Sequence, residues 1–78
     1  MKNDKLAEAK ALYQKGVVLE LTEALEDPYS PKPKGARFLV EYVDDGFNIH
    51  GSWQEPASGG LCLIVGVDKF RIVEEQSQ

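Results

Sequence analysis

The chain has 78 residues, a formal net charge of −4 and a single cysteine, Cys62. This length allows one small domain, and one cysteine excludes both an intramolecular disulfide and a zinc site of the multi-cysteine kind. The acidic balance disfavours a general nucleic-acid binder, because Lys and Arg on phosphate supply most non-specific affinity. No apolar run reaches the roughly 18 residues of a membrane helix, and the N-terminus has no apolar signal segment. We therefore expect a cytoplasmic protein.

Residues 1–15 predict a short N-terminal α-helix. Asn3 or Asp4 can cap it, and apolar residues then recur at helical spacing from Leu6 to Tyr13. Gly16 can end it. A helix of about three turns is marginal alone, so it must dock by its apolar stripe or fray. The sequence leaves open which of the two happens.

Five short segments after Gly16 have the composition or alternation of β-strands. They are Val17–Glu23, Ala36–Val43, Gly46–Trp53, Leu61–Val65 and Phe70–Val73. The proline-rich segment 27–35 and the segment 54–60 are predicted loops, because proline lacks the N–H that a sheet needs and glycine breaks regular structure. We predict a mainly β fold, with a helix over 1–15, a β domain over 16–74 and a disordered tail over 75–78.

The segment Asp44-Asp45-Gly46 is predicted to be a structural turn, because Asp-Gly is the strongest signal for a two-residue type I′ hairpin. That turn pairs Val40 with Gly51, Phe38 with Trp53, Tyr42 with Ile49 and Glu41 with His50. It places Tyr42 on the apolar face and His50 on the polar face beside Glu41. The two aspartates then need no metal, and the regular oxygen spacing of a calcium loop is absent.

Cys62 and His50 could formally make a nucleophile–base pair. However, Cys62 lies in an apolar run, where a thiol usually packs as a small hydrophobic group. The motifs of hydrolases, P-loop proteins and zinc proteases are also absent. The sequence therefore predicts a protein that is not an enzyme, with no catalytic residues, no metal and no cofactor.

Three stretches, DPYSPKPKGA, VEYVDDGFNIHGSW and LCLIVGVDKFRIV, resemble the domain-of-unknown-function family 4314. The matching positions are Asp27, Pro28, Tyr29, Gly35, Val43, Asp44, Asp45, Ile49, His50, Trp53, Leu61, Leu63, Gly66, Asp68 and Phe70. The resemblance spans roughly residues 16–74 and leaves the helix outside. Phe38 and Val65 depart from the family's usual glycine and proline, and the loop 54–60 is slightly longer. The resemblance implies a small SH3-like open barrel of bacterial or phage origin, with no established activity.

Two functions remain in competition. The first is a protein-interaction module, and one form of this function is a phage or mobile-element accessory protein that acts on a host protein. Its contacts would come from Tyr29, Pro31, Pro33 and Trp53, with Trp53 either a binding platform or part of the core. Tyr29, Trp53 and parts of the loops 27–35 and 54–60 would line a groove between these loops. The alternative is nucleic-acid binding through a local basic patch of Lys32, Lys34, Arg37, Lys69 and Arg71. The protein partner is not named by the sequence, and a homodimer is a further option.

Overall fold

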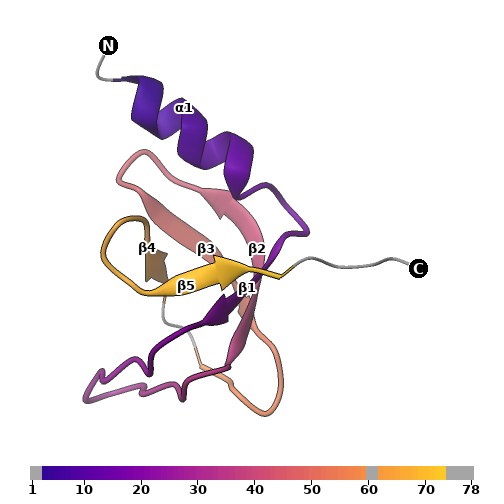
Figure 1. Ribbon diagram of the computed structural model, residues 1–78, viewed down its shortest axis with the longest axis vertical. Coiled ribbons are helices and arrows are strands. Elements are labelled where there is room, and N and C mark those ends of the chain that lie inside the picture. Colours follow the sequence, from indigo (N-terminus) through magenta and orange to yellow (C-terminus); the bar gives the residue numbers. More distant parts are fainter. Residues whose placement is uncertain (1–2, 60–61, 74–78) are drawn as a thin grey trace.

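The computed structural model describes residues 3–59 and 62–73. Its elements are one helix, α1 (Asn3–Leu12), and the strands β1 (Val18–Leu21), β2 (Arg37–Val43), β3 (Asn48–Trp53), β4 (Leu63–Ile64) and β5 (Phe70–Ile72) (Figure 1). The structure confirms the mainly β class, the short N-terminal helix and the five strands predicted from the sequence, although each strand is shorter than its predicted segment. The predicted tail, residues 75–78, lies outside the described residues.

The five strands form one antiparallel sheet in the order β4-β3-β2-β1-β5. Although β4 and β5 lie at opposite edges of this sheet, only residues 65–69 connect them. Five residues span at most about 18 Å, so the sheet has to curl until its two edges approach each other. The result is a half-barrel. The pairing of β5 with β1 continues beyond the strand ends, because the Thr22 N–H donates a hydrogen bond to the Lys69 carbonyl at 3.0 Å.

The core lies on the concave side of the curled sheet, where the alternation of β1, β2 and β3 directs apolar side chains inward. Its fully buried side chains are Leu19, Phe38, Val40, Ile49 and Leu63. Phe38 meets Trp53 edge to face, with ring centroids 4.9 Å apart. The aromatic at position 38, a departure from the family resemblance, therefore fills the core.

The β2–β3 hairpin follows the predicted register only at its open end. Phe38 pairs with Trp53 and Val40 with Gly51 as expected, but Tyr42 pairs with His50 and Val43 with Ile49. The change occurs because β2 bulges between Val40 and Tyr42, which shifts the remaining pairs by one residue. The predicted pairs of Tyr42 with Ile49 and of Glu41 with His50 are therefore wrong.

The turn of this hairpin also differs from the predicted two-residue type I′ turn. Asp44 accepts a hydrogen bond from the Phe47 N–H and donates one to Asn48, and Phe47 has a φ of 65°. This is a three-residue connection, in which a turn is followed by one residue in the left-handed region. Val43 consequently takes the buried position expected for Tyr42, and Tyr42 is 53% exposed.

Helix α1 docks against the half-barrel, which answers the question that the sequence left open (Figure 1). Ala9 is buried against the core, and Tyr13, just after the helix, meets Phe70 edge to face at 5.7 Å. Lys10 Nζ lies 3.1 Å from the carboxylate of Asp45 in the hairpin turn. In the described part of the chain, no helix has the length and apolar character needed to cross a membrane.

Candidate functional site

The segment from Leu25 to Lys32, here called the arm, projects from one end of the half-barrel (Figure 1). An antiparallel bridge closes its base, because Leu25 and Lys32 exchange two backbone hydrogen bonds of 2.8 and 3.0 Å. At its tip, the Asp27 carboxylate accepts hydrogen bonds from the N–H groups of Tyr29, at 2.7 Å, and Ser30, at 3.0 Å. This is an Asx turn, in which a side chain fixes the local backbone.

Tyr29 stands at the tip of the arm and is 95% exposed. Its backbone is held by the Asp27 carboxylate, while its ring points into solvent. Pro31, on the arm, and Pro33, just after it, are exposed as well. Three of the four residues predicted to bind a protein partner are therefore accessible.

Trp53, the fourth predicted residue, has a different place. Only 8% of it is exposed, and it packs on Phe38, so the structure decides for a core residue and against an exposed platform. Its ring also faces the arm, because Lys32 Nζ lies 5.3 Å from the ring centroid. Trp53 therefore contacts the arm through Lys32 and joins it to the core.

Lys32 is buried, with 3% of the residue exposed, which is uncommon for a lysine. Its ammonium donates hydrogen bonds to the carbonyl and the hydroxyl of Ser30 while it lies over the Trp53 ring. These contacts provide partners for the ammonium and hold the returning side of the arm against the Trp53 ring. They also leave Lys32 unavailable to phosphate groups.

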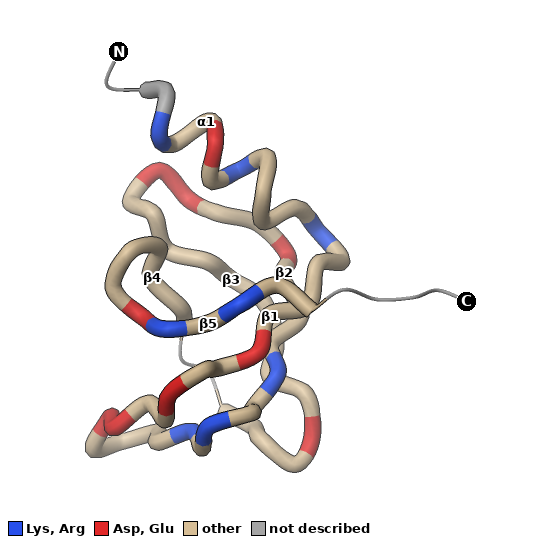
Figure 2. The backbone as a smooth tube through the Cα atoms, viewed as in Figure 1, with Lys and Arg blue, Asp and Glu red and all other residues tan. Residues whose placement is uncertain are grey.

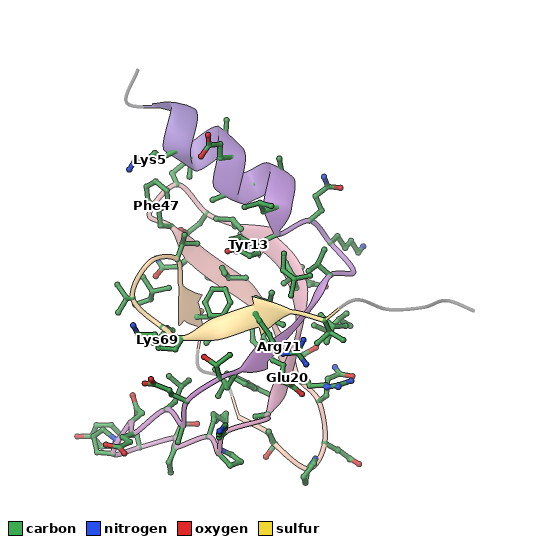
Figure 3. The ribbon with its side chains drawn as sticks, viewed as in Figure 1. Lys5, Tyr13, Glu20, Phe47, Lys69 and Arg71 are labelled. Carbon is green, nitrogen blue, oxygen red and sulfur yellow. The ribbon has the colours of Figure 1, made fainter. Side chains whose placement is uncertain are left out.

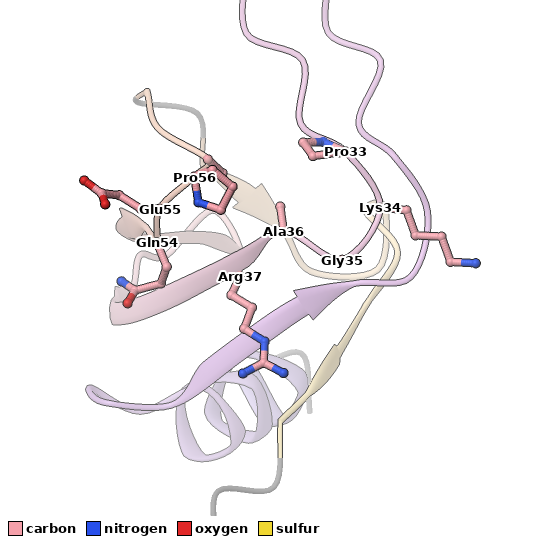
Figure 4. Close-up of a pocket in the computed structure, with 9 residues that line it drawn as sticks. Pro33, Lys34, Gly35, Ala36, Arg37, Gln54, Glu55 and Pro56 are labelled. Atoms are coloured by element: carbon pink, nitrogen blue, oxygen red, sulfur yellow. The ribbon is translucent and has the colours of Figure 1, made fainter.

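A pocket of about 250 Å³ lies beside the base of the arm, between the proline-rich loop and the loop after β3 (Figure 4). Pro33, Lys34 and Arg37 line one wall, and Gln54, Glu55 and Pro56 line the other. The sequence predicted a groove between these two loops, and the structure has one. Tyr29 and Trp53, which were expected in that groove, do not line it.

The basic residues proposed for nucleic acid do not form one patch. Because β1 lies between β2 and β5, the cross-strand neighbours Arg37, Glu20 and Arg71 form a row. Glu20 binds both guanidinium groups, at 3.3 Å to Arg37 and 2.7 Å to Arg71, and these contacts, chiefly the hydrogen bond from Arg71, lower the pKa of Glu20. Lys69 directly precedes β5, and its side chain points away from that of Arg71 (Figure 3).

A second cluster, on the outer face of the sheet, is made by the hairpin turn and β3. His50 Nε2 lies 2.8 Å from the Asp44 carboxylate, and His50 Nδ1 lies 3.5 Å from the Cys62 sulfur. The Tyr42 ring stacks on the imidazole, with centroids 4.6 Å apart. The bulge in β2 creates this arrangement, because it replaces Glu41 with Tyr42 opposite His50.

Asp44 is held by more than the histidine. Its carboxylate also accepts hydrogen bonds from the N–H groups of Gly46 and Asn48 and from the Asn48 side chain. The hydrogen bond with His50 and then those from Asn48 and Gly46 hold the pKa of Asp44 well below its usual range. The predicted turn role of Asp44 is therefore only part of its role. The only sequence signals for the rest were the proximity of Asp44 and His50 and the formal Cys–His pairing.

Comparisons with known proteins identify the family of the chain but no activity or partner. A family model described as "Domain of unknown function (DUF4314)" matches residues 2–73. No curated protein and no solved structure matches the chain. The matched region begins before α1, so the expectation that the helix lies outside the resemblance was wrong. Among the described residues, no group of three or more His, Cys, Asp or Glu side chains is placed to hold a metal ion.

Proposed function

The chain belongs to the DUF4314 family, and we propose that it is a non-catalytic protein-interaction module that uses the arm as its binding element. In this proposal, Tyr29 inserts into an apolar pocket on a partner protein whose surrounding surface is basic. The pocket beside Pro33 provides a second contact at the base of the arm. The expected setting is the cytoplasm, because a chain with a single cysteine has no intramolecular disulfide to form.

The observation that carries the proposal is a tyrosine, 95% exposed, on an arm whose tip and base are held by hydrogen bonds. Tyrosine is enriched among the residues that dominate binding energy at protein interfaces, because it combines a large apolar ring with a polar group. Ordering a flexible loop at an interface costs free energy, and a preformed loop avoids that cost. The Asx turn at Asp27 and the buried Lys32 ammonium order the arm before any partner arrives.

The acidic residues around Tyr29 indicate that the surface of the partner is basic. Acidic residues lie along the outgoing side of the arm and just before it, where Glu23 and Glu26 are exposed and Asp27 is half-buried (Figure 2). Lys32, on the returning side of the arm, is buried. A partner with a basic surface would associate faster and more selectively with this side of the arm.

The experiment is capture of partners from a lysate of the source cell with the tagged wild-type chain and two matched variants, Tyr29→Ala and Tyr42→Ala. Both variants remove an exposed tyrosine ring, but Tyr42 lies on the hairpin, away from the arm. Each capture is run with and without nuclease, and bound proteins are identified by mass spectrometry. Circular dichroism is used to check that both variants fold.

The proposal predicts a protein that survives nuclease treatment, is retained by Tyr42→Ala and is lost with Tyr29→Ala. Retention of that protein by Tyr29→Ala would contradict it. Loss of every partner after nuclease would favour the alternative of nucleic-acid binding, and light scattering of the pure chain would detect a homodimer.

A further inference from the structure

The cluster of Asp44, His50 and Cys62 has the connectivity of a nucleophile, a base and a group that orients the base. Cys62 Sγ faces His50 Nδ1, and His50 Nε2 faces Asp44 Oδ2. Cysteine nucleophiles in proteins are activated by this order of contacts, in which the far nitrogen of the imidazole is held by a third group. The three residues come from the hairpin turn, β3 and the segment just before β4, so the fold brings them together.

The contacts of Asp44 fix which nitrogen of His50 carries the proton. The carboxylate is ionised and can only accept hydrogen bonds, so the 2.8 Å contact requires a proton on His50 Nε2. In the neutral imidazole, Nδ1 then has a free lone pair, and this atom faces the Cys62 thiol at 3.5 Å. His50 is therefore oriented to accept the thiol proton.

Cys62 is also accessible, because it is only half-buried and lines a cleft of about 270 Å³. Leu25 and Ile64 contribute apolar walls to this cleft, and Glu26, Asp27 and Asp68 contribute acidic groups. Charged groups that line a cleft concentrate ligands of the opposite sign. Small cationic molecules should therefore reach the thiol more readily than anionic ones.

The geometry points to Cys62 as a reversible thiolation site, at which His50 acts as the acid–base group and Asp44 as its positioning residue, with small cationic disulfides as the preferred reactants. Thiol–disulfide exchange needs only a thiolate and an accessible disulfide. Acyl transfer would also need hydrogen-bond donors that stabilise an oxyanion, whereas thiol–disulfide exchange forms no oxyanion and needs no such donors. The cleft shares Leu25, Glu26 and Asp27 with the arm, but the inference does not rest on the binding role proposed for the arm.

The reaction balances without any further reagent. His50 Nδ1 takes the thiol proton, and the Cys62 thiolate attacks one sulfur of the disulfide. A new S–S bond forms to Cys62 as the old S–S bond breaks. The leaving thiolate takes the proton from the imidazolium, which returns His50 to its starting state. The products are a mixed disulfide on the protein and one free small thiol.

The test measures the second-order rate constant for the reaction of the reduced chain with cystamine, followed by the mass of the intact protein. The variants are His50→Gln, Asp44→Asn and the matched control Asp45→Asn, which removes the neighbouring charge without touching His50. Cys62→Ser is the blank. At pH 7 the first two variants should react about tenfold more slowly or worse, and Asp45→Asn should stay within about twofold of the wild type.

Two measurements on the wild-type chain keep the test decisive if a variant unfolds. At pH 6 the rate constant of the chain with cystamine should be about tenfold higher than that of free cysteine amide. Its preference for cystamine over the anionic dithiodipropionate should exceed that of cysteine amide by about tenfold. The inference is overturned if Asp44→Asn reacts like Asp45→Asn, or if the wild-type rate falls with pH in parallel with cysteine amide. A missing charge preference would overturn the assignment of cationic reactants.

Discussion

The Asp44 carboxylate lies 2.8 Å from the His50 imidazole across the turn of the β2–β3 hairpin, Oδ2 to Nε2. The same carboxylate accepts two backbone N–H groups, from Gly46 and Asn48, and so closes the turn. One side chain thus stabilises the tip of the hairpin and orients the only histidine of the chain. The turn and the cluster around Cys62 depend on each other.

This arrangement predicts a loss of stability in acid. The pKa of Asp44 is lowered in the folded chain, chiefly by its hydrogen bond with His50. The stabilisation is therefore fully present above the ordinary pKa of an aspartate and is lost progressively as the pH falls below that value towards the lowered pKa of the folded chain. Urea unfolding at pH 7, 5 and 3 measures it. Asp44→Asn should be less stable than the wild type at pH 7 and should lose less stability on acidification.

The matched control is Asp45→Asn, since Asp45 is exposed in the same turn and contacts only Lys10 among the interactions described above. Its dependence of stability on pH should follow the wild type. An Asp44→Asn variant with the same dependence as the wild type would show that the carboxylate does not have the lowered pKa.

Gly51 is required by the close approach of β2. A methyl group at this position would lie 2.0 Å from the Leu39 carbonyl oxygen and 3.0 Å from the Phe38 ring. Because backbone cannot move aside as a flexible side chain can, Gly51→Ala should lower the free energy of unfolding by about 2 kcal/mol or more. Ser52→Ala, on the next and exposed residue, should change it by about 0.5 kcal/mol or less. Urea unfolding followed by Trp53 fluorescence compares the two, and equal stabilities would contradict the close approach.

Lys32 is predicted to hold the arm. Lys32→Met keeps most of the apolar stem but removes the ammonium from the Trp53 ring and from Ser30. The loss should cost about 1–3 kcal/mol, because the part-buried Ser30 groups lose their donor. Lys34→Met, on the exposed neighbouring lysine, is the control and should be near neutral. The free energy of unfolding and the hydrogen exchange of the Leu25 and Lys32 amides report the effect, and unchanged exchange would refute the anchoring role.

Glu20 is predicted to suppress nucleic-acid binding by the two arginines beside it. Glu20→Gln removes the carboxylate that binds both Arg37 and Arg71. The variant should bind a single-stranded oligonucleotide more tightly than the wild type, with a salt dependence steeper by about one phosphate contact. Fluorescence anisotropy at several salt concentrations measures both quantities. Equal binding curves would show that the two arginines do not face a nucleic acid even when released.

The sequence predicted the five strands because apolar alternation depends only on which side of a strand faces the core. It did not predict the register near the turn. Asp-Gly favours a two-residue turn, whereas the structure uses Phe47 in the left-handed region, which is rare for an aromatic residue. A bulge in β2 then compensates, so that Val43 rather than Tyr42 is buried. Such a balance depends on packing across the whole sheet and leaves no local signal.

The candidate sites could be predicted only where local sequence determines them, as at Tyr29, and not where they depend on contacts between distant residues, as at Lys32. Tyr29 was predicted as a contact residue because prolines on both sides exclude it from a strand. The burial of Lys32 was not foreseen, because lysine is almost never buried without a partner, and its partner Trp53 is distant in sequence. The pair of Cys62 and His50 was considered from the sequence and set aside. The contact of Asp44 with His50 was not predicted, because the predicted register placed Glu41 beside His50.

The role of the arm as the binding element is tested most directly by the affinity of the captured partner for the wild-type chain, Tyr29→Ala and Tyr42→Ala, measured by titration calorimetry. We expect Tyr29→Ala to weaken binding by about 2 kcal/mol or more, roughly thirtyfold, whereas Tyr42→Ala should leave it near the wild-type value. Equal affinities for the wild-type chain and Tyr29→Ala would contradict the arm as the binding element.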